Sequence, residues 1–202
     1  MRFLAAFLCF IPALALADAA QDLKARLDEI HSLKGRFNQL LSDKNGKPLQ
    51  STSGEFAVKR PGYFLWQSEA PYEQTVIGTP EKVWVYDPDL EQVTIRKAQN
   101  EADGNPARLL SGDLSEIRST YEVSLQTADG ASRFQLVPKD ANSPYRHVEF
   151  EFKGSQLAGL DFKDKLGQQT QIKFEQVQPN ADIPSSVFVF NPPPGTDVIV
   201  DE

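Results

Sequence analysis

The sequence has almost no cysteine: Cys9 is the only one among 202 residues, and it lies inside an apolar N-terminal run. A chain with one thiol forms no internal disulfide, so a hydrophobic core or a ligand must stabilise the fold. Cys9 follows the bulky Leu8 and has little chain before it, which argues against lipid attachment at this cysteine. The sequence therefore predicts a protein without a disulfide framework.

The residues of common catalytic and metal sites are scarce as well. The sequence has only two histidines, His31 and His147, far apart in the chain. It has no Gly-x-Ser-x-Gly motif, no phosphate-binding Gly-Lys-Ser/Thr loop and no spacing typical of metal ligands. Glu149 and Glu151 share one strand face, but apolar residues form the opposite face, so we expect this pair to be solvated on the outside. We predict no enzymatic activity, no metal and no cofactor.

Basic residues are fewer than acidic ones, 21 against 28, which gives a net charge of −7. This excess of negative charge argues against binding to nucleic acid and against docking on an anionic membrane by overall charge. Beyond residues 1–17 the sequence has no second long apolar run, so we expect no helix that spans a bilayer.

The N-terminal segment, residues 1–17, has the pattern of a secretory signal peptide. Arg2 gives a positive start, the residues after it are almost all apolar, and Ala15 and Ala17 provide small residues before a cleavage site. Cleavage after Ala17 would leave residues 18–202 as an exported chain with a net charge of −8, because Arg2 is the only charged residue removed. One domain is the simplest organisation for this length.

The rest of the chain is dominated by strand patterns. Asp22 to Ile30 carries apolar residues at helical spacing and predicts one amphipathic helix. After Gly35, roughly eleven runs with strand composition follow, separated by turn signals such as Asn45-Gly46. The first two lie on either side of this turn and extend to Lys59. The others are Tyr63–Ser68, Glu73–Thr79, Val83–Asp87, Glu91–Lys97, Tyr121–Ala128, Ser132–Pro138, Arg146–Lys153, Gln156–Asp164, Gln168–Gln178 and a short piece at Val187–Phe190.

One segment, Asn100 to Arg118, interrupts the strands and predicts a loop with one or two short helices. A twisted antiparallel sheet of this many strands curls, and the helical pieces are the only candidates to cover its concave face. The predicted fold class is therefore mainly β, an incomplete, open antiparallel barrel of about eleven strands. A helical lid is expected to close it over an apolar cavity.

The stretch Lys59–Trp66 combines a charged residue with aromatic ones around a turn. Arg60, a permanent cation with five donors, precedes Pro61-Gly62, and Phe64 and Trp66 then share one strand face. One interpretation is a hinge or lid contact beside an apolar surface. The other is a β-turn with a solvated arginine, followed by aromatic residues of an ordinary core.

Four segments together resemble the outer-membrane lipoprotein carrier family of Gram-negative bacteria, LolA. They are Asp18–Leu27, Val58–Trp66, Val83–Gln92 and the ending Phe188–Gly195, and their order and spacing match over essentially the whole chain after residue 17. The resemblance implies an incomplete barrel of eleven strands with a helical lid.

The resemblance also implies a function. A member of this family is a periplasmic, monomeric chaperone that accepts triacylated outer-membrane lipoproteins from an inner-membrane ABC-type release complex of the LolCDE kind. It delivers them to the outer-membrane receptor LolB and binds no nucleic acid.

The resemblance assigns roles to particular residues. The arginine that holds the lid shut falls on Arg60, and two aromatic residues of the cavity fall on Phe64 and Trp66. Lid residues fall within Pro106–Ile117. We expect the acyl-chain cavity to be lined by Phe37, Phe56, Phe64, Trp66, Trp84, Leu109, Leu110 and Phe150.

Two other functions are compatible with the same fold. A periplasmic regulator could use such a half-barrel to sense lipid or mislocalised lipoprotein, and such regulators carry a second domain. An enzyme acting on envelope lipids is disfavoured by the missing nucleophile and metal sites. The match over the whole chain favours the carrier.

Overall fold

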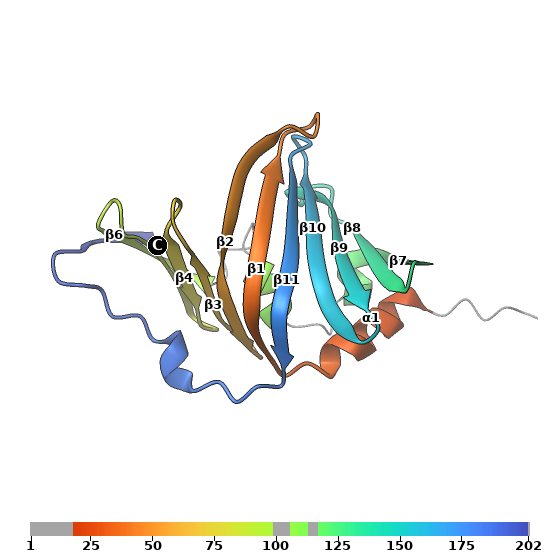
Figure 1. The fold of residues 1–202 in the computed structure, drawn as a ribbon, viewed down its shortest axis with the longest axis horizontal. Helices are drawn as coiled ribbons and strands as arrows, with labels where there is room; N and C mark the ends of the chain where they lie inside the picture. Colours follow the sequence, from red (N-terminus) through yellow and green to blue (C-terminus); the bar gives the residue numbers. More distant parts are fainter. Residues whose placement is uncertain (1–17, 99–105, 113–116, 202) are drawn as a thin grey trace, which may run out of the picture.

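The computed structural model describes residues 18–98, 106–112 and 117–201. The segment expected to be a signal peptide and parts of the expected loop between residues 99 and 116 lie outside the described residues. Most of the described chain is one strongly curved sheet, seen in Figure 1 from its convex side, with the short helices α2 (Pro106–Ser111) and α3 (Ile117–Thr120) behind it.

The sheet has twelve described strands in the order β12-β6-β5-β4-β3-β2-β1-β11-β10-β9-β8-β7. Neighbours are antiparallel except β12 and β6, which are parallel. No pairing among the described residues joins β12 to β7, so the barrel is open, and the predicted fold class is confirmed. The strands are β1 Ser32–Ser42, β2 Pro48–Lys59, β3 Tyr63–Ser68, β4 Gln74–Gly78, β5 Lys82–Asp87, β6 Gln92–Lys97, β7 Tyr121–Ala128, β8 Ala131–Pro138, β9 Tyr145–Lys153, β10 Gln156–Asp164, β11 Gln169–Pro179 and β12 Asp197–Asp201.

Three helices lie on the concave side: α1 Ala19–Asp28, α2 Pro106–Ser111 and α3 Ile117–Thr120. The first begins earlier than the expected Asp22, because the Asp18 carboxylate accepts hydrogen bonds from the backbone N–H groups of Ala20 and Gln21 and caps the helix. Buried Leu23 and Leu27 face the sheet. The described helices therefore form a cover over the concave face.

The C-terminal part of the chain differs from the sequence prediction. The expected strand at Val187–Phe190 is a 3-10 helix, η2 Ser185–Phe188, because Phe188 packs on the sheet instead of extending it. The strand β12 was not predicted: it pairs in parallel with β6, and parallel pairs have no hairpin turn that a sequence could reveal.

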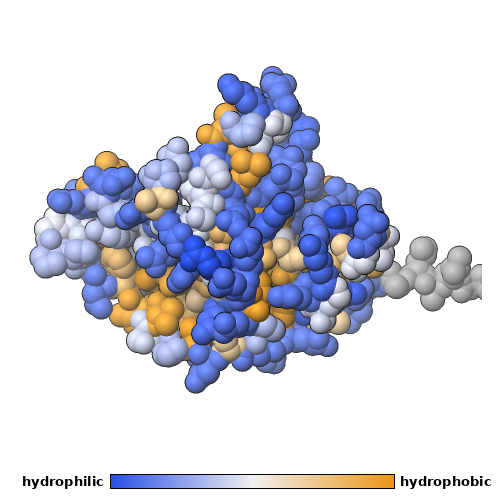
Figure 2. All heavy atoms as spheres, in the orientation of Figure 1, coloured by the Kyte–Doolittle hydropathy of each residue, from blue (hydrophilic) through white to orange (hydrophobic). Residues whose placement is uncertain are grey.

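Because side chains alternate along a strand, each strand contributes to two separate apolar clusters. Phe56 and Trp66 face the concave cluster, whereas their neighbours Ala57 and Leu65 face the convex one. The convex cluster is covered by the segment Ala181–Phe190, which includes η2. Figure 2 shows the convex face: hydrophobic residues gather at the lower left, near η2, and the area over β8 to β10 is mostly hydrophilic.

Candidate functional site

Aromatic side chains dominate the concave face of the β1–β3 region. Phe37 of β1 stacks on Trp66 of β3 with ring centroids 3.9 Å apart, and Phe56 of β2 lies 5.8 Å from the same tryptophan. Phe174 of β11 extends the group, 4.9 Å from Phe56. These rings come together because the strand register pairs Phe56 with Trp66, and Phe37 with Phe174, across adjacent strands.

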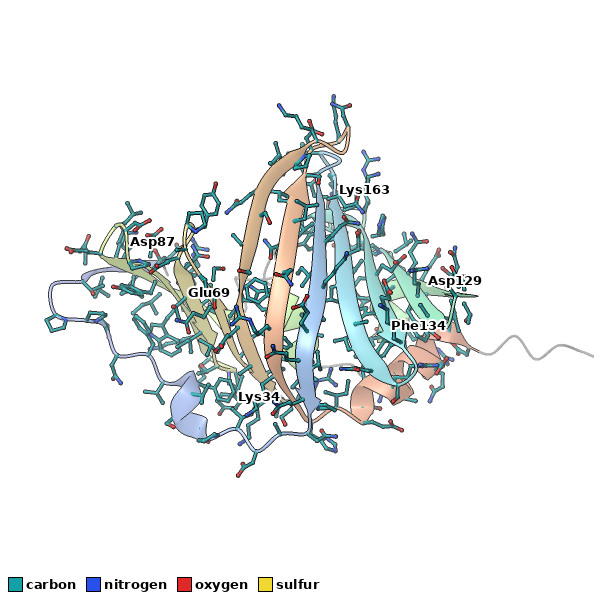
Figure 3. The ribbon with its side chains drawn as sticks, viewed as in Figure 1. Lys34, Glu69, Asp87, Asp129, Phe134 and Lys163 are labelled. Atoms are coloured by element: carbon teal, nitrogen blue, oxygen red, sulfur yellow. The ribbon has the colours of Figure 1, made fainter. Side chains whose placement is uncertain are left out.

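The other half of the sheet continues the apolar surface. Phe134 of β8 and Phe152 of β9 meet edge to face at 5.8 Å, below the helix α1. The guanidinium of Arg26 on α1 lies 5.4 Å from the Phe134 ring and 5.6 Å from the Phe152 ring. This cation–π contact fixes one end of the cover to the sheet. Figure 3 labels Phe134, which lies near α1.

The cover itself contributes leucine and isoleucine side chains. Leu23 and Leu27 of α1 are fully buried, Leu110 of α2 is 3% exposed and Ile117 of α3 is 7% exposed. All four belong to the concave cluster. Each helix has ten residues or fewer, and such short helices are stabilised mainly by packing, so the cover depends on its contacts with the sheet.

Arg60 joins two helices of the cover. Its Nε donates to the Leu110 carbonyl at 2.7 Å, and its Nη1 donates to the Leu27 carbonyl at 2.6 Å. Both acceptors lie in the last turn of their helices, where the helix dipole is negative. The Leu27 carbonyl also accepts from the Ile30 N–H at 3.1 Å. Next to it, the Gly62 N–H donates to the Ser111 carbonyl at 2.9 Å. The turn between β2 and β3 thus binds the ends of both α1 and α2.

The electrostatics of Arg60 reflect its position. Burial lowers its pKa to about 10, and the nearby Asp28 carboxylate opposes this effect. The guanidinium therefore keeps its charge at neutral pH, and two backbone carbonyls replace part of its lost hydration. Such a group holds the cover by hydrogen bonds of a kind that water can also form.

The structure brings most of the expected cavity residues to one surface. Leu109 is partly buried against the concave cluster, and six others are buried within it: Phe37, Phe56, Phe64, Trp66, Leu110 and Phe150. Their side chains pack against each other and against the helices, and all six are 5% exposed or less. Apolar side chains therefore fill the concave face beneath the helical cover.

Trp84 is a correction. The strand register pairs Trp84 of β5 with Ile77 of β4, and Ile77 with Leu65 of β3, which places all three on the convex face. Trp84 packs there in the cluster with Ile183 and Phe188 of the C-terminal segment. The expectation that it lines the concave cavity is wrong.

Several residues of the site were not foreseen from the sequence. Phe134, Phe152 and Phe174 belong to the concave cluster, and the alternation of apolar residues in their strands could have identified them. Gly62 could not have been found, because it acts through its backbone N–H.

The described part of the chain lacks both a metal-binding cluster and a membrane-spanning helix. Within residues 18–98, 106–112 and 117–201, no group of three or more His, Cys, Asp or Glu residues is arranged to hold a metal ion. Of the helices drawn in Figure 1, none is long and apolar enough to cross a membrane.

The chain has close relatives among known proteins. The family model described as outer membrane lipoprotein carrier protein LolA matches residues 28–191. The outer-membrane lipoprotein carrier protein of Azotobacter vinelandii is 41% identical over 188 residues, which cover 93% of this chain and 91% of that protein.

Solved structures with low sequence identity share the fold. An uncharacterized conserved protein from Thermus thermophilus superposes with a TM-score of 0.55 at 11% identity, covering 90% of this chain and 99% of that one. MucB superposes with a TM-score of 0.52 at 16% identity, covering 89% of this chain and 65% of that one. The family match, at high identity and nearly full coverage, is the decisive finding: this chain belongs to the outer-membrane lipoprotein carrier family, LolA.

Proposed function

We propose that this chain is a non-enzymatic periplasmic carrier that shields the acyl chains of lipoproteins between the concave face of its sheet and its helical cover. The observation that carries the proposal is a continuous aromatic surface closed by short helices, whose ends Arg60 binds through two hydrogen bonds and the Gly62 N–H through a third. An apolar guest beneath the cover can form with the concave face the apolar contacts that the cover forms in its absence. A rigid core does not permit this exchange.

The energetics define what the carrier needs from a partner. Each buried methylene is worth about 0.8 kcal/mol, so three acyl chains hidden from water represent tens of kcal/mol. The sequence has no nucleotide-binding loop that could supply this energy. We therefore propose that an inner-membrane ABC-type release complex of the LolCDE kind loads the cargo.

Release follows from competition between guest and cover. When the guest leaves, the concave face regains its contacts with Leu27 and Leu110, and Arg60 regains its two carbonyl acceptors. This closed state lowers the net affinity for acyl chains, because the guest must first displace the cover. A receptor without such a competing cover would bind the cargo more tightly, and we propose that LolB has this role.

A lipid-sensing regulator is the alternative function for this fold. MucB has the same architecture, but 16% identity supports a shared fold and nothing more. The relative at 41% identity carries the name of a lipoprotein carrier, and it supports transport instead of sensing.

The test is native mass spectrometry of the exported protein after incubation with spheroplasts that display inner-membrane lipoproteins. We expect a one-to-one complex with a triacylated lipoprotein, which disappears when the purified outer-membrane receptor is added. A spectrum with only free protein, or with a small lipid that the receptor does not remove, would overturn the carrier proposal in favour of the regulator.

A further inference from the structure

Two turns form a common tip at one end of the longest strands. We define the tip as residues 43–49, between β1 and β2, together with residues 163–168, between β10 and β11. The turns lie side by side: a Cβ atom placed on Gly167 would be 3.0 Å from the Cβ of Lys44. In Figure 1 both turns lie at the top of the sheet, far from α1, and Figure 3 labels Lys163 near the same end.

The tip is basic although the chain is acidic. It contains Lys44, Lys47, Lys163 and Lys165 against two carboxylates, whereas the whole chain has a net charge of −7. Among the described residues, none of these four lysines forms an ion pair. Lys165 donates to a backbone carbonyl, that of Ala141, at 2.7 Å. Lys44, Lys47 and Lys165 are exposed and Lys163 is half-buried, and within the described part of the chain no carboxylate neutralises any of the four.

The two acidic residues of the tip are used for turn formation. Asp43 accepts from the backbone N–H groups of Asn45 and Lys47 at 2.8 and 2.9 Å. Asp164 accepts from the backbone N–H of Gln168 at 2.8 Å. Just outside the tip, Arg146 donates to the Lys165 carbonyl and adds one more cation, while Asp140 and Lys139 balance each other. The field around the tip is thus positive.

An exposed leucine lies between these cations. Leu166 is 79% exposed, the largest exposed fraction among the exposed large hydrophobic residues, and it is flanked by Lys165 and Gly167. Leu49, on the neighbouring turn, is 48% exposed. A single apolar side chain on a protruding turn can bury little area against another protein, whose stable interfaces need a broad patch. It can enter the headgroup region of a bilayer, which deforms around it.

We propose that this tip binds the surface of a bilayer that contains anionic phospholipids. Lys44, Lys47 and Lys165 contact the lipid phosphates, Lys163 contributes from the side, and Leu166 enters the interfacial layer. Basic residues near an anionic surface add to the attraction, and salt screens it, so binding is weak, reversible and salt-dependent.

Overall charge and local charge have different consequences here. The net charge of −7 repels the body of the molecule from an anionic surface, in agreement with the exclusion drawn from composition. The same repulsion leaves one favourable orientation, with the basic tip toward the membrane. The inference concerns a surface distant from the concave face, and it does not depend on whether that face binds acyl chains.

The test is flotation of the exported protein, purified from the periplasm, with vesicles of phosphatidylcholine alone or mixed with phosphatidylglycerol at low salt. Lys44→Glu/Lys47→Glu removes two tip cations, and Lys82→Glu/Lys97→Glu is the matched control. The control pair is exposed and directly cross-strand on β5 and β6, and it changes the net charge equally. Leu166→Ser is matched by Leu90→Ser, which is 67% exposed elsewhere.

We expect wild type and both controls to float with phosphatidylglycerol vesicles and not with phosphatidylcholine vesicles. The tip charge reversal should weaken binding by about thirtyfold or more, because the effects of the two lysines multiply. Leu166→Ser should weaken it by about tenfold. Equal binding to both vesicle types, or equal loss for tip and control variants, would overturn the proposal. The proposal would also be overturned if the tip variants floated normally but lost binding to an acidic protein partner. The same preparations are tested for capture of a fluorescent acyl probe. This second assay distinguishes a failure of carrier function from a failure of membrane binding by the tip.

Discussion

The sheet has two apolar faces, and the two segments that cover them are attached in different ways. On the convex face, the segment Ala181–Phe190 is attached mainly by packing, with Phe188 at 3% exposure and 5.7 Å from the Tyr63 ring. Its backbone is held as well: Ser32 donates to the Ala181 carbonyl at 2.6 Å and Lys59 to the Ile183 carbonyl at 3.2 Å.

On the concave face, three short helices rest on aromatic side chains, and Arg60 and the Gly62 N–H bind the helix ends. If the concave cover opens, water can take the place of the carbonyl acceptors in these hydrogen bonds. The convex cover instead packs on side chains of the same chain, and we expect no other molecule to replace those contacts. The comparison indicates that the convex cover belongs to the stable fold, and we propose that the concave cover is the part that moves.

The largest effect should come from the convex cover. Phe188→Ala removes a buried ring, and we expect a loss of about 3 kcal/mol in the free energy of unfolding. For a chain of this size that corresponds to a fall of about 6 to 12 °C in the melting temperature, measured by circular dichroism. Val189→Ala is the control, because Val189 is 58% exposed and should change the free energy by no more than about 0.5 kcal/mol. If Phe188→Ala lost acyl-probe binding but kept its stability, the convex cover would serve function and not stability, which would contradict the comparison.

Arg60→Leu should change function more than stability. The variant loses both carbonyl contacts but also the cost of burying a cation, so we expect a net stability change within about 1 kcal/mol. The cover should open more often, so that cargo loads but is released poorly to the receptor. Hydrogen exchange of residues 106–111 should become faster. Arg36→Leu is the control, because Arg36 pairs with Glu69 and Glu55 on the outer face. Normal handover by Arg60→Leu would contradict the role of this residue.

The closed cover should not respond to pH near neutrality. Burial lowers the pKa of Arg60 to about 10 in the folded chain, so the unfolded chain binds more protons only between about pH 10 and the higher, ordinary pKa of the guanidinium. This group therefore adds stability only as the pH rises through that range, and below about pH 9 it is charged in both states. We expect the protection of residues 106–111, corrected for intrinsic exchange, to be constant between about pH 6 and pH 8. A steep change in that interval would mean that another titrating group holds the cover.

The smallest effect is expected on the uncovered half of the convex face. Burial raises the pKa of Glu149, Asp161 adds to the rise, and Arg133 and His147 oppose it. Because the folded chain binds this proton more tightly, the carboxylate costs stability as the pH rises through its raised pKa. Glu149→Gln should therefore raise the melting temperature at pH 7 by about 1 °C, and the gain should vanish below about pH 4. A lower melting temperature at pH 7 would show that the pairing with Arg133 dominates.

Local patterns predicted much of the fold. The strands β3, β7 and β10 have the bounds expected from alternation and turn residues, because the side-chain period and the turn chemistry both lie within a few residues of sequence. The apolar spacing predicts a start of α1 near Asp22, later than the observed Ala19, because the Asp18 cap extends the helix beyond its apolar repeat.

The face of a side chain was harder to predict. Trp66 and Trp84 both lie in alternating runs, but their relative faces depend on the register of β3, β4 and β5, which no local pattern encodes. The resemblance assigned a lid contact to Arg60, and one of its acceptors, the Leu110 carbonyl 50 residues away, lies in the expected lid segment. The other acceptor, the Leu27 carbonyl 33 residues away in α1, was not expected, because any residue type provides a carbonyl.

The two tryptophans allow the central claim to be tested directly. They are the only ones in the chain, Trp66 on the concave face and Trp84 on the convex face. Trp84→Phe leaves Trp66 as the sole reporter, and Trp66→Phe leaves Trp84. Acyl chains brominated along their length quench tryptophan fluorescence on contact. We expect quenching when Trp66 remains and none when Trp84 remains. Equal quenching of both, or quenching of Trp84 alone, would show that acyl chains do not bind beneath the helical cover.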